Sequence, residues 1–225
     1  MLLGFARFGR RGLHSHSWQS FQRAAGLPDN GEVTAETLTA LRVSLHADYE
    51  GLSLLPGATP GGVVTWSIDV DTLPIQLKID PVLQEFHNAF APWSKATSIN
   101  FVYVPLDPEG GLPDILLSFR NRTPGNEFAF DGPGGSLAAA SLGALVFDAS
   151  ERWELSGTAH PHRQVLDWDE EYFALLPVAI HEIGHALGLD HSDGPNDVMS
   201  PYYDAKRVKL SENDIQRVQA VIGSV

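Results

Sequence analysis

The residues best suited to chemistry lie in one short stretch, HEIGHALGLDH, which begins at His181. His181 and His185 stand four residues apart, so on a helix both imidazoles leave the same face and can share one metal ion. Glu182 follows the first histidine, where its carboxylate can take a proton from a water molecule without being a ligand. Gly188 can adopt the positive φ that ends the helix and brings His191 round as a third ligand. Three neutral imidazoles and one open position are typical of a catalytic zinc site.

The flanks of this stretch favour a buried helix over an ordinary amphipathic helix with surface histidines, because apolar residues surround both ligands: Val178, Ala179, Ile180, Ile183, Ala186 and Leu187. The stretch resembles the zinc signature of the metzincin metalloproteases. Those enzymes carry a methionine turn below the metal, and the Met-x-Pro-x-Tyr order from Met199 to Tyr203 resembles their matrixin branch, the matrix metalloproteases. The resemblance implies that Met199 forms an apolar floor under the metal, and that Pro201 and Tyr203 form a wall of the specificity pocket.

Composition excludes several classes of protein. The 225 residues suit one medium domain, or one such domain plus a small appendage, and 43% of them are hydrophobic, as in globular proteins. No apolar run approaches the ~20 residues of a membrane span. A net charge of -13 argues against a nucleic-acid partner and suits calcium. Because the chain has no cysteine, any metal must be held by histidines, carboxylates and carbonyls.

The N-terminal part predicts a small helical module over residues 1–50, a Gly- and Pro-rich linker over 51–62 and a catalytic domain over 63–225. The module resembles the peptidoglycan-binding-like unit of matrixin propeptides, through Phe-Gln-Arg, Gly-Leu-Pro and Glu-Thr-Leu in that order. A cell-wall glycan is therefore a possible partner. The first residues show no clear signal peptide, although a transit-like leader is an alternative, and we expect the chain to start inside a propeptide. The resemblance implies a secreted or extracellular protein.

Apolar patterns in the catalytic domain predict an α/β (α+β) fold, because a helix stands between strands in a way that requires crossover connections. The resemblance implies the metzincin fold, a twisted mixed sheet with an active-site helix and a C-terminal helix. Residues 154–172 are polar and predict a solvated approach to the active-site helix, which should begin near Leu176. The expected strands cover residues 63–70, 99–104, 114–119 and 137–142, and the other two helices cover 81–93 and 212–222.

The segment from Phe130 to Ser136 is too rich in glycine and proline for regular structure, so its carbonyls are free to bind a hard cation. The matrixin pattern adds an aspartate and a glutamate further along the chain. The resulting calcium ligands are Asp131, Gly132, Gly134, Ser136, Asp148 and Glu151. Small apolar residues follow the loop and suit the edge strand on which matrixins bind an extended substrate, namely Leu137, Ala138 and Ala139.

The chain departs from the matrixin pattern in two places. Matrixins usually hold a second, structural zinc, but the four positions expected to ligate it are Pro124, Asn126, Ala139 and Val146, so we expect one catalytic zinc, at least one calcium and no structural zinc. The cysteine that normally blocks the open zinc position is also missing. Its place falls on His46, and Asp48 stands two residues on; either could serve, or residues 46–50 could be a solvated linker.

The leading interpretation is a zinc-dependent endopeptidase of the matrixin type, a monomer that hydrolyses peptide bonds of extended polypeptides. The alternative from another class is a cell-wall glycan-binding protein with the metalloprotease domain as scaffold. Glu182 argues against that alternative, because a binding scaffold needs no general base. A third interpretation is a zinc hydrolase acting on something other than peptides, although the edge strand favours an extended peptide.

Overall fold

The computed structural model describes residues 55, 57–107, 111–121, 130, 133, 136–141, 143–157 and 172–223. The predicted helical module lies outside these residues, as do five of the twelve positions of the predicted linker. So do seven of the positions singled out above: His46, Asp48, Pro124, Asn126, Asp131, Gly132 and Gly134.

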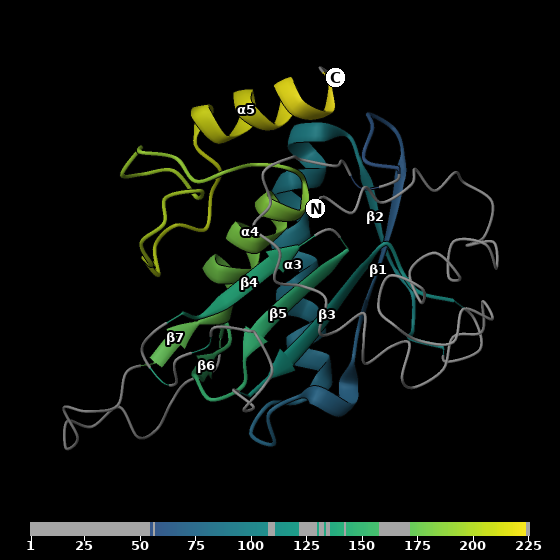
Figure 1. The fold of residues 1–225 in the computed structure, drawn as a ribbon, viewed down its shortest axis with the longest axis vertical. Coiled ribbons are helices and arrows are strands. Elements are labelled where there is room, and N and C mark those ends of the chain that lie inside the picture. The colour runs from purple at the N-terminus through teal and green to yellow at the C-terminus, as the bar shows by residue number, and fades with distance from the viewer. Residues whose placement is uncertain are drawn as a thin grey trace, which may run out of the picture.

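The centre of the fold is a five-stranded sheet in the order β2-β1-β3-β5-β4 (Figure 1). Its strands are β1 (Val63–Ile68), β2 (Asn100–Tyr103), β3 (Ile115–Arg120), β4 (Ala138–Ser141) and β5 (Ala144–Asp148). Neighbouring strands run parallel, except that β4 is antiparallel to β5. The predicted mixed sheet is therefore confirmed, and the predicted edge strand does lie at an edge.

The sequence of strand β5 is a nearly continuous run of apolar residues. All five of its residues are buried, as expected for an inner strand that is covered on both faces. Leu145 and Phe147 belong to the main hydrophobic core, whereas Val146 belongs to a separate small cluster with Phe130. Since successive side chains of a strand point to opposite faces, this second cluster covers the other face of the sheet.

Helix α3 (Ile79–Thr97) packs its apolar side chains against the sheet. Phe86 and Phe90 lie 6.4 Å and 5.0 Å from Trp66 of β1, measured between ring centroids. The helix begins before Pro81, where the prediction placed its start. Proline is tolerated there because the N–H groups of a first helical turn have no partner within the helix.

Two further helices complete the domain. Helix α4 (Leu175–Ala186) contacts α3, and the indole Nε1 of Trp93 donates a hydrogen bond of 2.9 Å to the carbonyl of Ile180. Helix α5 (Glu212–Ile222) has the predicted bounds and contacts α3 at the top of Figure 1. Its first turn is closed by a capping box between Ser211 and Asp214. No helix among the described residues is both long and apolar enough to cross a membrane.

The interpretation of residues 154–172 as a polar approach missed a small second sheet. Strands β6 (Arg152–Glu154) and β7 (Tyr172–Ala174) pair in parallel, and α4 follows β7 directly. Strands of three residues are too short to show a period of two, so the sequence carries almost no signal for them. The described part of this stretch is thus partly regular structure, and it fixes the start of α4.

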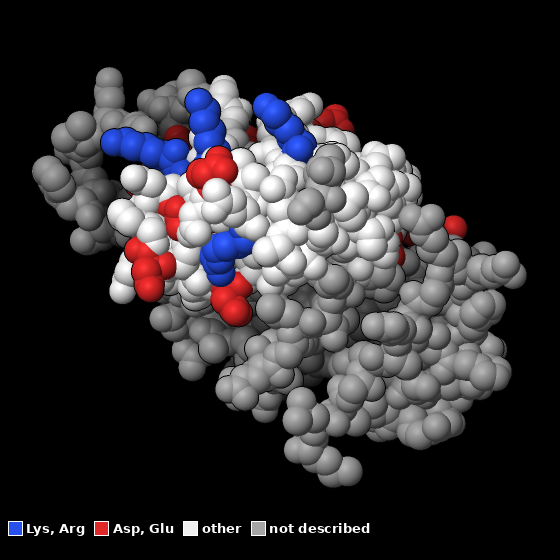
Figure 2. All heavy atoms as spheres, turned by 90° about the horizontal axis from the view of Figure 1, so that it is seen from above, with Lys and Arg blue, Asp and Glu red and all other residues white. Residues whose placement is uncertain are grey.

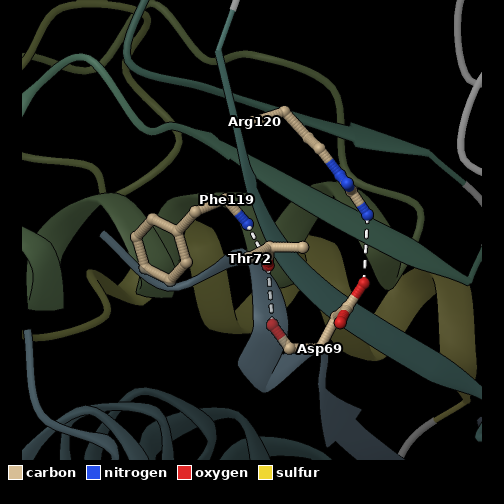
Figure 3. A network of polar contacts seen from close by, with 4 residues as sticks. All are labelled: Asp69, Thr72, Phe119 and Arg120. Atoms are coloured by element: carbon tan, nitrogen blue, oxygen red, sulfur yellow. Dashed lines mark hydrogen bonds and ion pairs between the residues drawn. The ribbon is translucent and has the colours of Figure 1, made fainter. Parts of the chain in front are cut away.

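The turn after β1 is tied to the end of β3 by a polar network (Figure 3). Thr72, in the 3-10 helix η1 (Val70–Thr72), donates a hydrogen bond to the carbonyl of Asp69 and accepts one from the backbone N–H of Phe119. The Asp69 carboxylate forms an ion pair of 3.0 Å with the guanidinium of Arg120. The C-terminal ends of β1 and β3 are therefore linked to each other at the same end of the sheet.

Basic and acidic side chains are mixed on the face seen in Figure 2, which looks down on the molecule from the α5 side of Figure 1. Although the whole chain carries a net charge of -13, this face has no broad field of one sign among the described residues. It offers no electrostatic reason to expect a polyanion there.

Candidate metal centre

Helix α4 and the loop after it bring three imidazoles together. His181 and His185 lie one turn apart on α4, and their Nε2 atoms are 3.0 Å apart. The Nε2 atoms of His185 and His191 are 3.3 Å apart. One ring nitrogen from each residue lies within 4.8 Å of the others, so among the described residues these three histidines form a group that could hold a metal ion, and Glu182 is not part of it.

The outer nitrogens of two of these rings determine how the inner nitrogens can act. Nδ1 of His181 lies 2.7 Å from the carbonyl of Val198, and Nδ1 of His185 lies 2.7 Å from the carbonyl of Leu189. A carbonyl only accepts hydrogen bonds, so each Nδ1 carries the proton and donates it. In the neutral rings both Nε2 atoms then present lone pairs to each other at 3.0 Å. Such an arrangement is repulsive without a cation and fits one well.

Burial keeps two of these imidazoles in the neutral state. It lowers the pKa of His181, and it lowers the pKa of His185 to about 3. Both imidazoles therefore stay neutral at physiological pH, as a zinc ligand must.

Glu182 is buried beside the ligands, with only 6% of its surface exposed. Burial raises the pKa of its carboxyl to about 8, because the charged form loses its hydration. A nearby dication would favour the ionised carboxylate and bring that pKa back down. The group can therefore hold or release a proton near neutral pH.

A left-handed glycine turns the chain after α4, as the sequence predicted. Gly188 has φ of 92°, and the backbone N–H of Leu189 donates to the carbonyl of Gly184 over 3.0 Å. The turn leads into the loop that carries His191. Further on, the N–H of Ser192 donates to the carbonyl of Met199 over 2.9 Å, so this loop is also tied to the methionine turn.

Met199 lies directly against the active-site helix and is fully buried. A Cβ added at Gly184 would stand only 2.3 Å from its Sδ atom and 2.9 Å from Cζ2 of Trp93. A residue with a side chain therefore does not fit between the two histidines of α4. Met199 is therefore in contact with the helix that carries His181 and His185, and its role as a floor under the metal stays a prediction.

Asp214 at the start of α5 holds the methionine turn from the other side. Its carboxylate accepts hydrogen bonds from the backbone N–H groups of Val198, at 2.9 Å, and Met199, at 3.3 Å. The carbonyl of Val198 is the one that orients His181. A chain of contacts thus runs from α5 to the first ligand. Sequence reasoning missed this role of Asp214, although its place three residues after Ser211 was a visible capping signal.

The predicted substrate-binding residues lie on or next to β4 and in the segment between α4 and α5. Strand β4, with Ala138 and Ala139, lies at the sheet edge and contacts α4. Tyr203 accepts a hydrogen bond of 2.8 Å from the N–H of Ala174 through its hydroxyl, and its ring packs edge-on against Phe173 at 5.1 Å. Tyr203 is thereby anchored to β7, although both Tyr203 and Pro201 are exposed.

Two of the predicted calcium ligands are buried carboxylates. Asp148 is fully buried, and its Oδ1 accepts hydrogen bonds from the N–H and hydroxyl of Ser150, at 2.7 Å and 2.6 Å. Its other oxygen, Oδ2, is buried and has no hydrogen-bond partner in the described structure. Glu151 is 1% exposed, whereas Ser136 is exposed at the described end of the loop. A buried carboxylate oxygen without a donor fits a hard cation.

Apolar contacts occupy the described positions where a structural zinc would require histidines. Ala139 and Val146 face each other as paired residues of β4 and β5. Val146 is 2% exposed and clusters with Phe130, which is also 2% exposed. Neither of these two side chains has an atom that can ligate a metal.

Comparison with known proteins agrees with the geometry. The sequence model of the Matrixin family matches residues 59–223. Matrilysin of Felis catus is 39% identical over 211 residues, which cover 90% of this chain and 67% of the relative. Matrix metalloproteinase-26 of Homo sapiens is 33% identical over 185 residues, covering 78% of this chain and 64% of the relative. Matrix metalloproteinase-C of Caenorhabditis elegans is 30% identical over 223 residues, which cover 92% of this chain and 36% of the relative.

This chain therefore belongs to the matrixin family, whose members are metalloendopeptidases. The chain spans about two thirds of the length of matrilysin and of matrix metalloproteinase-26, and about a third of the length of matrix metalloproteinase-C. The family implies zinc, and the cluster of His181, His185 and His191 fits a zinc site.

Proposed function

We propose that this protein is a zinc-dependent endopeptidase that cleaves extended polypeptides, with His181, His185 and His191 as the zinc ligands. The observation that carries the proposal is the pair of 2.7 Å contacts from Nδ1 to backbone carbonyls, which aim two Nε2 lone pairs at one point. Membership of the matrixin family supports the same reaction and supports a secreted or extracellular location.

Glu182 is the general base and acid of this proposal. His181, His185 and His191 would hold the zinc, which when bound would supply Lewis acidity to a water molecule and to the scissile carbonyl. Glu182 accepts the proton of that water and later donates it to the leaving amine. Burial raises the pKa of its carboxyl and a bound dication would lower it again, and these opposing effects suit a group that holds the proton between the two steps.

The substrate is proposed to pair with β4 as an added strand. In the described sheet β4 has β5 on one side only, so its other side is free to pair with an extended chain beside α4. Leu137, Ala138 and Ala139 would form this contact, and Pro201 and Tyr203 would line the pocket for the neighbouring side chain. The link between Tyr203 and Ala174 gives that pocket a fixed wall.

Calcium is proposed to bind near the end of β5 and to stabilise the fold. The buried Oδ2 of Asp148 and the buried Glu151 support this proposal. The loop residues Asp131, Gly132, Gly134 and Ser136 are the proposed remaining ligands, as the family pattern implies. A structural zinc is not part of the proposal, because Ala139 and Val146 place apolar side chains where ligands would be needed.

The experiment that tests this function is digestion of a peptide library by the parent and by Glu182→Ala, with and without a zinc chelator. Both should be assayed as the full chain and as a chain beginning near Gly61, in case the N-terminal part is inhibitory. The variant should lose cleavage while zinc content stays near one per chain, because the carboxylate serves the water and not the metal. Glu212→Ala, at an exposed position of α5, is the matched control and should stay active.

Retention of most activity by Glu182→Ala would refute the general-base assignment. Cleavage by the parent that survives complete removal of zinc would refute the metalloprotease proposal itself. Metal analysis of the dialysed parent tests the proposed zinc content of one ion per chain. Two tightly held zinc ions per chain would contradict the proposed absence of a structural zinc.

A further inference from the structure

His191 is held less securely by its own side chain than the other two histidines. His181 and His185 lie on α4 and each anchors Nδ1 to a backbone carbonyl. His191 stands in the loop beyond Gly188 and is exposed, and no described residue forms a hydrogen bond with its Nδ1. Its position therefore depends on whatever holds the backbone of that loop.

Arg217 of α5 holds this backbone from the neighbouring helix. Its Nη2 donates to the carbonyl of Asp190 over 2.8 Å and to the carbonyl of His191 over 3.3 Å. The other terminal nitrogen, Nη1, is buried and has no hydrogen-bond partner among the described residues. A guanidinium suits this task because its planar group presents several donors in a fixed geometry.

Helix α5, which carries Arg217, is itself held in place at two points. Helix α5 is closed at its start by the capping box of Ser211 and Asp214, and Gln219 donates to the carbonyl of Ala96 in α3 over 2.9 Å. The same helix, through Asp214, holds the methionine turn. Helix α5 is thus connected to both the first and the third histidine of the cluster.

We propose that Arg217 is a positioning residue that fixes His191 for metal binding by clamping the carbonyls of Asp190 and His191. The inference rests on the proposed zinc site. When a residue orients a metal-ligating residue through hydrogen bonds, its removal typically weakens metal binding by about 10- to 100-fold.

The positive charge of Arg217 acts in the opposite direction. A cation near the site repels a dication, and Arg217 is one of the lesser causes, after burial, that lower the pKa of His185. If this repulsion outweighed the clamp, removing Arg217 would tighten zinc binding. The direction of the change therefore distinguishes the two effects.

The test measures zinc affinity of the full chain, stripped of metal, by competition with a fluorescent zinc chelator. Arg217→Met removes the donors and the charge while keeping an unbranched side chain, and we expect it to bind zinc about 10- to 100-fold more weakly. Arg217→Lys keeps the positive charge but replaces the planar guanidinium with a less specific donor. Its zinc affinity should lie between that of Arg217→Met and that of the parent. Gln216→Ala, which removes a surface hydrogen bond to Glu212 from the same helix, is the control and should match the parent.

Arg217→Met with the affinity of the parent, or with tighter binding, would overturn the inference. If Arg217→Met does not fold, the affinity of Arg217→Gln decides the question by the same criterion. A parent that binds no zinc would instead contradict the proposed function, so the two failures are distinguishable. Cleavage at saturating zinc gives a second readout: the Arg217→Met enzyme should recover most of its activity there, because the clamp acts on metal binding.

Discussion

Replacing Gly184 with alanine tests the packing between the active-site helix and the methionine turn. The residue lies inside α4, one position before His185. Helix propensity alone predicts that the change stabilises the protein by about 1 kcal/mol, because glycine is a poor helix former. The structure predicts the opposite sign, so the experiment separates local preference from tertiary packing.

The size of the effect follows from the space available. The new Cβ would stand 2.3 Å from Sδ of Met199, whereas carbon and sulfur atoms in contact need about 3.5–4.0 Å. Met199 and Trp93 are both fully buried, and the Trp93 indole is tied to Ile180, so neither can move aside freely. Overpacking of this kind costs about 1–3 kcal/mol, and its upper end applies here. After subtracting the gain in propensity, we expect a loss of about 2 kcal/mol.

The assay is urea denaturation of the parent and of Gly184→Ala at fixed zinc and calcium concentrations. The expected loss corresponds to a fall in Tm of about 4–8 °C for a domain of this size. Met199→Ala serves as the background for a double-mutant cycle. In that background the contact with Sδ is gone and only the one with Cζ2 of Trp93 remains, so Gly184→Ala should cost clearly less stability than it does in the parent. Equal or higher stability of the single variant, or the same loss in both backgrounds, would refute the packing argument.

Two further predictions concern calcium and latency. Asp148→Asn removes the charge of a buried carboxylate, so the rise in Tm that calcium gives the parent should shrink markedly, and an unchanged calcium response would exclude this residue as a ligand. If His46 or Asp48 blocks the zinc, the full chain should cleave peptides more slowly than a chain beginning near Gly61. In that case either His46→Ala or Asp48→Ala should release the activity, whereas equal rates in the long and short chains would show that there is no switch.

Most of the main elements of the catalytic domain could be predicted because their signals are local, although β5, an inner strand of the sheet, was not predicted. The spacing of Phe86, Phe90 and Trp93 indicates a helix, and the bounds of α5 follow from its apolar face and its cap. Strands β6 and β7 could not be predicted, because they consist of three residues each and pair only with each other. Their existence depends on a long-range contact that no short window of sequence contains.

The sequence by itself determined the identity of the candidate metal ligands. A separation of four residues puts His181 and His185 on one face of any helix, and Gly188 permits the turn that brings His191 back. It also determined that Val146 cannot ligate a zinc. These conclusions require only side-chain chemistry and helix geometry.

Only the tertiary structure decided what orients and surrounds those ligands. The carbonyl of Val198 that fixes the tautomer of His181, the clamp of Arg217 on the loop of His191, and the close contact between Gly184 and Met199 join segments that are distant in sequence. Arginine on a helix surface is usually solvated, so nothing in the sequence distinguishes Arg217 from other basic residues. Its role exists because folding places α5 within hydrogen-bonding distance of one particular pair of carbonyl groups.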